Sequence, residues 1–202
     1  MRFLFRVLAM IAVPFAGNVT AQLLSQEQHP SLLFKTGDIP LLQERIKREP
    51  YATWWRTIAA RVDAAPSIYD NDRAKARQAK SLGFAFAMTG NEDYASEGVR
   101  LLQEIVFPPR GGDMGEPHLE ADVVALYANA YDMLHPFLVR DEQAMSAIRG
   151  SLAEEADRLF QGLKVGVGSL KYRLHTTDHL DNWHLRVYGA LGLAAWALAD
   201  HE

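Results

Sequence analysis

The sequence contains no cysteine among its 202 residues. This absence excludes a disulfide, a thiolate nucleophile and a cysteine-ligated metal. An exported protein of this composition must therefore obtain its stability from the packed core alone. A membrane-spanning run is missing near the N-terminus as well, because the apolar stretch at residues 7–16 is about half of the roughly 20 residues that a spanning helix needs.

An excess of positive charge is also missing. The chain carries 21 Lys and Arg against 25 Asp and Glu, which gives a formal net charge of −4. Nucleic-acid-binding surfaces usually have a basic excess, so this balance argues against nucleic acid as a partner. A polyanionic carbohydrate stays open as a partner, because a local basic cluster can exist in an acidic protein. With 49% hydrophobic and 23% charged residues, the composition is that of an ordinary globular domain.

The first 21 residues have the pattern of a secretory signal peptide. Arg2 and Arg6 flank the start of the apolar run at residues 7–16, and small residues lead to Ala21. We expect cleavage after Ala21, a mature start at Gln22, and a periplasmic or secreted protein without membrane attachment after cleavage. The alternative, a buried first helix, is disfavoured because the run has no amphipathic period.

The remainder of the sequence is a succession of helix patterns bounded by proline, glycine and asparagine. We expect Asp38 to cap the first helix and Pro50 to end it, and Gly90 and Asn91 to separate the third helix from the fourth. Pro136 should separate the fifth from the sixth. No segment shows sustained strand alternation. The predicted helices cover about residues 38–49, 51–65, 72–89, 91–107, 118–134, 141–165 and 182–199.

Tight junctions alternate with longer ones along this succession. The pattern predicts an all-α fold of antiparallel helical hairpins laid side by side. The last helix is apolar nearly all round at residues 189–198, and such a helix needs burial on every side. The sequence stops at Glu202, so we expect the chain to be the first part of a longer protein.

Four stretches of the sequence, taken in order, carry a resemblance to a known family. They are HPSLLF at 29–34 with DIPLLQERI at 38–46 and WW at 54–55, residues 76–102 with TGNEDYA at their turn, ANAYDML at 128–134, and DNWH at 181–184 leading into GALGL at 189–193. Together they resemble the opening of polysaccharide lyases of the heparinase II/III and alginate lyase type, and the likeness covers almost all of the mature chain. The resemblance implies an incomplete α/α toroid at residues 22–202, truncated before the remaining helices and any β-sandwich domain.

Lyases of this kind cleave uronic-acid polysaccharides by β-elimination, so the resemblance implies an alginate-type or heparan-type substrate. The C5 proton of a uronate is poorly acidic because its carboxylate is already negative, and a donor must hold that carboxylate while a base takes the proton. By resemblance, Asn182 is the neutralising residue, with His184 as a second catalytic residue. The family's tyrosine base corresponds to a position after Glu202, so we expect this chain alone to be inactive. No cofactor is implied.

Several residues near these positions are expected to contact the substrate. Aromatic faces suit the apolar face of a sugar ring, which favours Trp183 and Tyr131 as stacking platforms. The alternative is that aromatic residues at helical spacing lie in the core. The full set of expected substrate-binding residues is Tyr131, His179, Trp183, Arg186 and Tyr188.

The catalytic assignments have alternatives that the sequence leaves open. Asn182 is also well placed to cap the last helix. His175 and His179 stand four residues apart, with His184 nearby as a possible third zinc ligand. The pair falls in or beside an irregular stretch, where a shared helical face is not expected, so we predict no metal.

Two other functions remain open at the level of sequence. A glycoside hydrolase on the same toroid needs two carboxylates that flank the scissile bond, and Glu120, Asp122 or Asp181 is a candidate for one of them. A non-enzymatic carbohydrate-binding module needs no such pair. The fold alone does not choose among a lyase, a hydrolase and a binding module.

Overall fold

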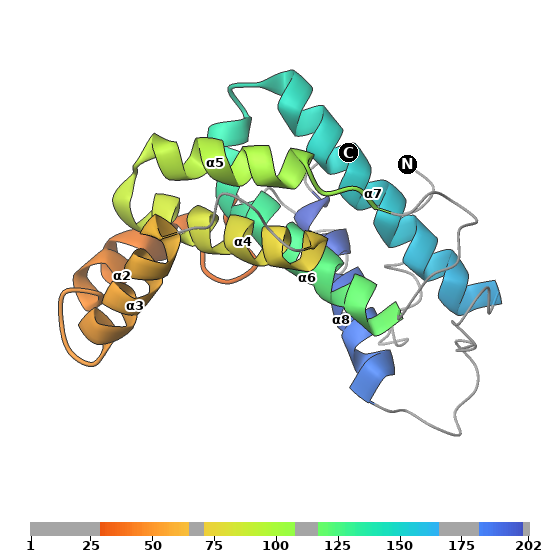
Figure 1. Cartoon of the computed structure of the whole chain (residues 1–202), viewed down its shortest axis with the longest axis horizontal. Helices are drawn as coiled ribbons and strands as arrows, with labels where there is room; N and C mark the ends of the chain where they lie inside the picture. Colours follow the sequence, from red (N-terminus) through yellow and green to blue (C-terminus); the bar gives the residue numbers. More distant parts are fainter. Residues whose placement is uncertain (1–28, 65–70, 108–116, 166–181, 200–202) are drawn as a thin grey trace, which may run out of the picture.

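The computed structural model describes residues 29–64, 71–107, 117–165 and 182–199, and the regular structure in these ranges is entirely helical (Figure 1). The all-α prediction is confirmed for this part of the chain, and the predicted signal peptide lies outside it. The elements are a 3-10 turn η1 (Thr36–Asp38) followed by α2 (Ile39–Arg45), α3 (Tyr51–Asp63), α4 (Asp72–Thr89), α5 (Glu92–Gln103), α6 (Pro117–Leu138), α7 (Glu142–Val165) and α8 (Asn182–Ala197).

The boundaries of α4 and α5 follow from local chemistry. The Asn71 side chain accepts the Ala74 N–H at 2.9 Å at the start of α4, and Asn91 accepts the Asp93 N–H at 3.0 Å at the start of α5. Between the two helices Gly90 has a φ of 71°, a left-handed conformation that glycine adopts without a steric penalty. The predicted roles of Gly90 and Asn91 are confirmed.

The predicted start of α2 is confirmed, because Asp38 directly precedes the helix, although its side chain makes no cap hydrogen bond and instead accepts the Lys35 N–H at 2.9 Å. Two predicted ends are wrong. The helix α2 ends at Arg45, ahead of Pro50. Pro136 does not end α6, which continues to Leu138. A proline this close to a helix C-terminus removes a single ladder bond, the one that would reach the Asp132 carbonyl, so the last turn still forms.

The central helix of the described structure is α6, which packs against α4, α5, α7 and α8 (Figure 1). Its contacts with α4 show that these two helices are parallel. Near their starts Arg73 of α4 contacts Asp122 of α6, and near their ends the rings of Phe86 and Phe137 lie 6.0 Å apart between centroids. The N-terminal ends of α4 and α6 therefore lie at the same end of the molecule.

The helix α8 is parallel to α6 as well. Arg186, in the second turn of α8, contacts Asp122 near the start of α6. In the last turn of α8 the Trp196 ring donates a hydrogen bond to Ser31, which is itself bonded to Asp132 near the end of α6. Contacts thus advance in step along both helices, and α4, α6 and α8 all begin at one end.

The intervening helices return in the opposite direction. Lys75, at the start of α4, donates to the carbonyl of Glu104, just after the end of α5. Glu120, near the start of α6, forms an ion pair with Arg158 in the last third of α7. Hence α5 is antiparallel to α4, and α7 is antiparallel to α6.

Small residues let these helices approach one another closely. A Cβ atom added at Gly98 of α5 would lie 2.9 Å from Leu134 Cδ1 of α6 and 3.5 Å from Leu82 Cβ of α4, so α5 sits in the groove between the other two. The largest side chains that are fully buried around this groove and along α7 are Tyr127, Tyr131, Leu101, Leu102, Met133, Leu134, Leu138, Ile148, Leu152 and Leu159.

Both edges of the helical array expose apolar side chains. The helices α2 and α3 pack on α4, but α3 buries only Val62, and Trp54 on its outer side is 59% exposed. On α8 the side chain of Leu185 is 65% exposed and that of Trp196 is 43% exposed. The buried side chains of α8, which pack on α6 and α7, are Val187, Ala190, Leu191, Ala194, Ala195 and Ala197.

Candidate functional site

A three-residue ion cluster lies at the common N-terminal end of α4, α6 and α8. Arg73 Nη2 is 2.5 Å from Asp122 Oδ2, and Arg186 Nη1 is 3.6 Å from the same oxygen. Each residue comes from the first two turns of its helix, so the parallel arrangement of the three helices brings them together. We refer to Arg73, Asp122 and Arg186 as the arginine cluster.

The arginine cluster is positively charged and open to solvent. The side chains of Arg73 and Arg186 are 40% and 47% exposed, and that of Asp122 is 21% exposed. One carboxylate faces two guanidinium groups, so the cluster has a net positive charge. The starts of α4, α6 and α8 contribute positive partial charge here, while the ends of α5 and α7 contribute negative partial charge at the same end of the molecule. The positive charge is therefore local to the arginine cluster, and the cluster is the part of this end that suits a negatively charged ligand.

The predicted catalytic residues lie at the start of α8. Asn182 is the first residue of the helix, whereas a cap residue would precede it. By helical spacing Asn182 and Arg186 share one face of α8. The side chains of Asn182, Trp183 and His184, and the whole of His179, lie outside the described residues, so their roles remain predictions.

The other predicted substrate contacts differ in accessibility. Arg186 is exposed within the arginine cluster. Tyr188 is half-buried, and this burial raises the pKa of its hydroxyl above the ordinary value of 10.0. Tyr131 is fully buried, and its ring packs edge-on against His29 and His135. A buried ring presents no face to a sugar, so we place no substrate against Tyr131 below.

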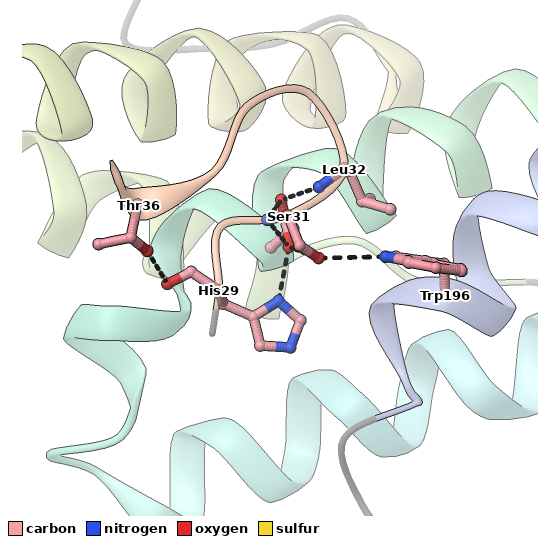
Figure 2. Close-up of polar contacts among 6 residues, drawn as sticks. His29, Ser31, Leu32, Thr36 and Trp196 are labelled. Atoms are coloured by element: carbon pink, nitrogen blue, oxygen red, sulfur yellow. Dashed lines mark hydrogen bonds and ion pairs between the residues drawn. The ribbon is translucent and has the colours of Figure 1, made fainter. Parts of the chain in front are cut away.

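A second polar cluster, absent from the predictions, surrounds the buried carboxyl group of Asp132. His29 Nδ1 lies 2.5 Å from Asp132 Oδ1. The Ser31 N–H donates to both carboxyl oxygens at 2.9 and 3.0 Å, and the Leu32 N–H donates to Oδ2 at 3.0 Å (Figure 2). We refer to these four residues as the Asp132 cluster. It fixes the segment before η1 to the late part of α6.

Further contacts join the Asp132 cluster to the rest of the array. Trp196 Nε1 of α8 donates to Ser31 Oγ at 3.2 Å (Figure 2). Thr36 Oγ1 donates to the His29 carbonyl at 3.1 Å, and the His135 ring of α6 lies 4.2 Å from the His29 ring. The segment at residues 29–36 therefore bridges α6 and α8.

One sequence signal pointed to this cluster. Asp132 is an acidic residue within the apolar stretch ANAYDML at 128–134, and a buried carboxyl group has to find hydrogen-bond donors. The identity of the donors was not readable, because His29 lies 103 residues away in the sequence. The contact depends on the tertiary fold.

The carboxylates considered for a hydrolase are held by arginine where the structure describes them. Asp122 belongs to the arginine cluster. Glu120 forms an ion pair with Arg158, which also binds Glu155. Burial raises the pKa of the Glu155 carboxyl above its ordinary value of 4.5, and the nearby Glu120 carboxylate raises it further, even though Arg158 lowers it. Asp181 lies outside the described residues.

In the part of the chain that the structure describes, three or more His, Asp or Glu side chains do not gather in an arrangement that would hold a metal ion. In the same part, no helix combines the length and the apolarity that a membrane crossing requires. A comparison of the whole sequence with models of known protein families and with curated proteins finds no significant match.

Proposed function

We propose that the chain is the N-terminal part of an exported polysaccharide lyase, in which an α/α toroid binds an acidic polysaccharide and cleaves it by β-elimination. The observation that carries the proposal is the shared N-terminal end of α4, α6 and α8, where the arginine cluster lies beside the turn that begins at Asn182. In a toroid of helical hairpins the inner helices are parallel to one another, and the outer helices run antiparallel to the inner ones. The directions of α4 to α8 fit that scheme, with α5 and α7 as the outer helices.

The contact between two of the lyase-like stretches supports the same proposal. Ser31 and Leu32 belong to HPSLLF at 29–34, and Asp132 belongs to ANAYDML at 128–134. Hydrogen bonds join the two stretches directly. Two stretches that are far apart in the sequence, and that resemble the same family, therefore contact each other. Such a contact is expected if both belong to one fold.

The proposed chemistry assigns roles to residues at the start of α8. A base removes the C5 proton of a uronate, the electron pair forms the C4–C5 double bond, and the C4–O bond to the leaving sugar breaks as that oxygen takes up a proton. Negative charge spreads onto the carboxylate during this step, so a donor there stabilises the transition state more than the ground state. We assign this role to Asn182 with His184 beside it, and we assign substrate binding to His179, Trp183, Arg186 and Tyr188. The resemblance places the base outside this chain.

Two substitutions in the complete protein test the role of Asn182. Asn182→Ala should lower kcat by roughly 10²–10³-fold and change KM little, because the lost bond is made mainly in the transition state. Asn182→Asp keeps a side chain that favours a helix N-terminus but repels the uronate, so it should be equally inactive. A stable and fully active Asn182→Asp enzyme would show that Asn182 serves only the helix end, and it would remove the residue from the catalytic site.

The product identifies the reaction class. With alginate-type or heparan-type substrates, a lyase yields an ultraviolet-absorbing unsaturated sugar, a hydrolase yields reducing ends alone, and a binding module yields neither. The 202-residue chain should give no turnover, because holding the carboxylate without a base does not remove the proton. Robust lyase activity from this chain would show that the base lies within it.

A further inference from the structure

The arginine cluster contains more hydrogen-bonding capacity than its own carboxylate uses. Asp122 is the acidic side chain that Arg73 and Arg186 contact among the described residues, and the two contacts are 2.5 and 3.6 Å long. The longer one exceeds an ordinary hydrogen bond. The Arg73 Nε–H is buried and therefore does not face a ligand. Each guanidinium has five N–H donors, and the exposed part of both side chains retains donors that Asp122 does not use.

The chemistry of these donors selects an anion with paired oxygens. A guanidinium group is planar and always charged, and its fork of donors matches a carboxylate or a sulfate with two parallel hydrogen bonds. Two such groups on neighbouring sides of one aspartate present a convergent cationic surface. Neutral sugars offer hydroxyl groups but no charge, and they gain little from this surface.

The position of the arginine cluster relates it to the proposed reaction centre. Arg186 follows Asn182 by one helical turn on the same face of α8. Arg73 of α4 contacts the same oxygen of Asp122, so the two guanidinium groups converge on one carboxylate. The cluster therefore lies about one helical turn from Asn182, at the starts of the three parallel helices.

We propose that Arg73 and Arg186 form a binding site for the carboxylate or sulfate of a sugar adjacent to the one held at Asn182, and that Asp122 occupies this site when no ligand is bound. The inference rests on the proposed function and deepens it by naming an acidic neighbouring sugar as a requirement. The ligand displaces the loose Arg186–Asp122 contact and binds both guanidinium groups, while Asp122 keeps them aligned.

Titration of the 202-residue chain with three hexasaccharides tests the site. The probes are an alginate-type oligomer with carboxylates only, a heparin-type oligomer with carboxylates and sulfates, and a neutral glucan. We expect Arg73→Gln and Arg186→Gln each to weaken binding of an acidic probe by about 10–100-fold, as loss of a charge-assisted bond implies. Asp122→Asn should tighten it, because the internal competitor loses its charge. Binding of both acidic probes identifies the carboxylate as sufficient, and binding of the heparin-type probe alone identifies sulfate.

A matched control separates the arginine cluster from general charge. Arg56 is an exposed arginine, ion-paired with Glu49 on the far edge of the array, so Arg56→Gln should leave the affinity unchanged. Circular dichroism of each variant checks folding, and Arg73→Lys retains the charge without the fork and should bind with intermediate affinity. Wild-type affinity in both Arg73→Gln and Arg186→Gln, or equal binding of the neutral glucan, would overturn the inference.

The same variants distinguish this inference from the proposed function. If the complete protein forms unsaturated sugars and neither Arg→Gln change raises KM, the lyase proposal stands and the anion site is wrong. If acidic probes bind through Arg73 and Arg186 but no unsaturated product forms, the anion site stands and the lyase proposal is wrong.

Discussion

Removal of the Asp132 carboxyl group is the sharpest test of what holds the N-terminal segment to the helical array. Asp132→Ala removes the acceptor of His29 Nδ1–H, of the backbone N–H groups of Ser31 and Leu32, and of the Ser31 hydroxyl, which donates a longer bond of 3.4 Å. A buried donor that loses its acceptor costs about 1–3 kcal/mol, so the upper limit for the first three, which make the shorter bonds, is about 9 kcal/mol. Water that enters the vacated space recovers part of this, and we expect a loss of about 3–5 kcal/mol, as for a buried pair from which one partner is removed.

Urea unfolding followed by far-ultraviolet circular dichroism measures this loss, and Asp141→Ala is the matched control. The Asp141 side chain accepts a single N–H, that of Ala144 at 3.0 Å, at the exposed start of α7, so its removal should cost about 1 kcal/mol. If Asp132→Ala does not fold, Asp132→Asn serves in its place, because it keeps the shape of the side chain and one acceptor oxygen. Its loss in free energy of unfolding should lie between the losses expected for Asp132→Ala and Asp141→Ala. A loss no larger than that of Asp141→Ala would refute the reasoning, as would unchanged hydrogen-exchange protection of the Ser31 amide.

Gly98→Ala should destabilise the protein by about 1–2 kcal/mol, because overpacking against Leu134 of α6 outweighs the gain in helix propensity. Gly150 has open space around it, so Gly150→Ala should stabilise the protein by about 0.5–1 kcal/mol. Equal changes of melting temperature in the two variants would contradict the close approach of α5 to α6. Burial raises the pKa of Glu155 above 4.5, so its contribution to stability falls as the pH rises above that value, and Glu155→Gln should gain on the wild type toward neutral pH. At Glu97 an arginine hydrogen bond lowers the pKa, so the wild type should lose its advantage over Glu97→Gln as the pH falls below 4.5. Denaturation at a series of pH values that gave the same sign for both variants would refute the assignment.

The sequence was a good guide to the helices where their ends depend on neighbouring residues. Asn91 and Gly90 act within one turn of their own positions, through a side-chain cap and a left-handed φ, so their effect is readable locally. The end of α6 is not predicted by Pro136, because the free-energy cost of a proline in a helix depends on how many turns follow it. Here the helix ends two residues after the proline. The relative directions of the helices depend on tertiary contacts such as the Phe86–Phe137 ring pair, which the sequence does not predict.

The candidate site was only partly readable for the same reason. Arg186 was singled out because it follows Asn182 on a predicted helix, and a helical period is a local property. Arg73 was missed because its role depends on the register between α4 and α6, which brings it to Asp122 across 49 positions of sequence. The burial of Tyr131 is not readable from the sequence, because apolar periodicity does not say which side of a central helix faces solvent. The helix α6 is covered on several sides, and Tyr131 lies on a covered one.

The distance along the chain between His29 and its acceptor has a consequence during synthesis. The two residues are 103 positions apart, and translation proceeds at roughly 5–20 residues per second, so roughly 5–20 s pass between the appearance of His29 and that of Asp132. Throughout this interval the acceptor for residues 29–32 does not exist. The late position of Asp132 thus sets the earliest moment at which residues 29–32 can be fixed to α6.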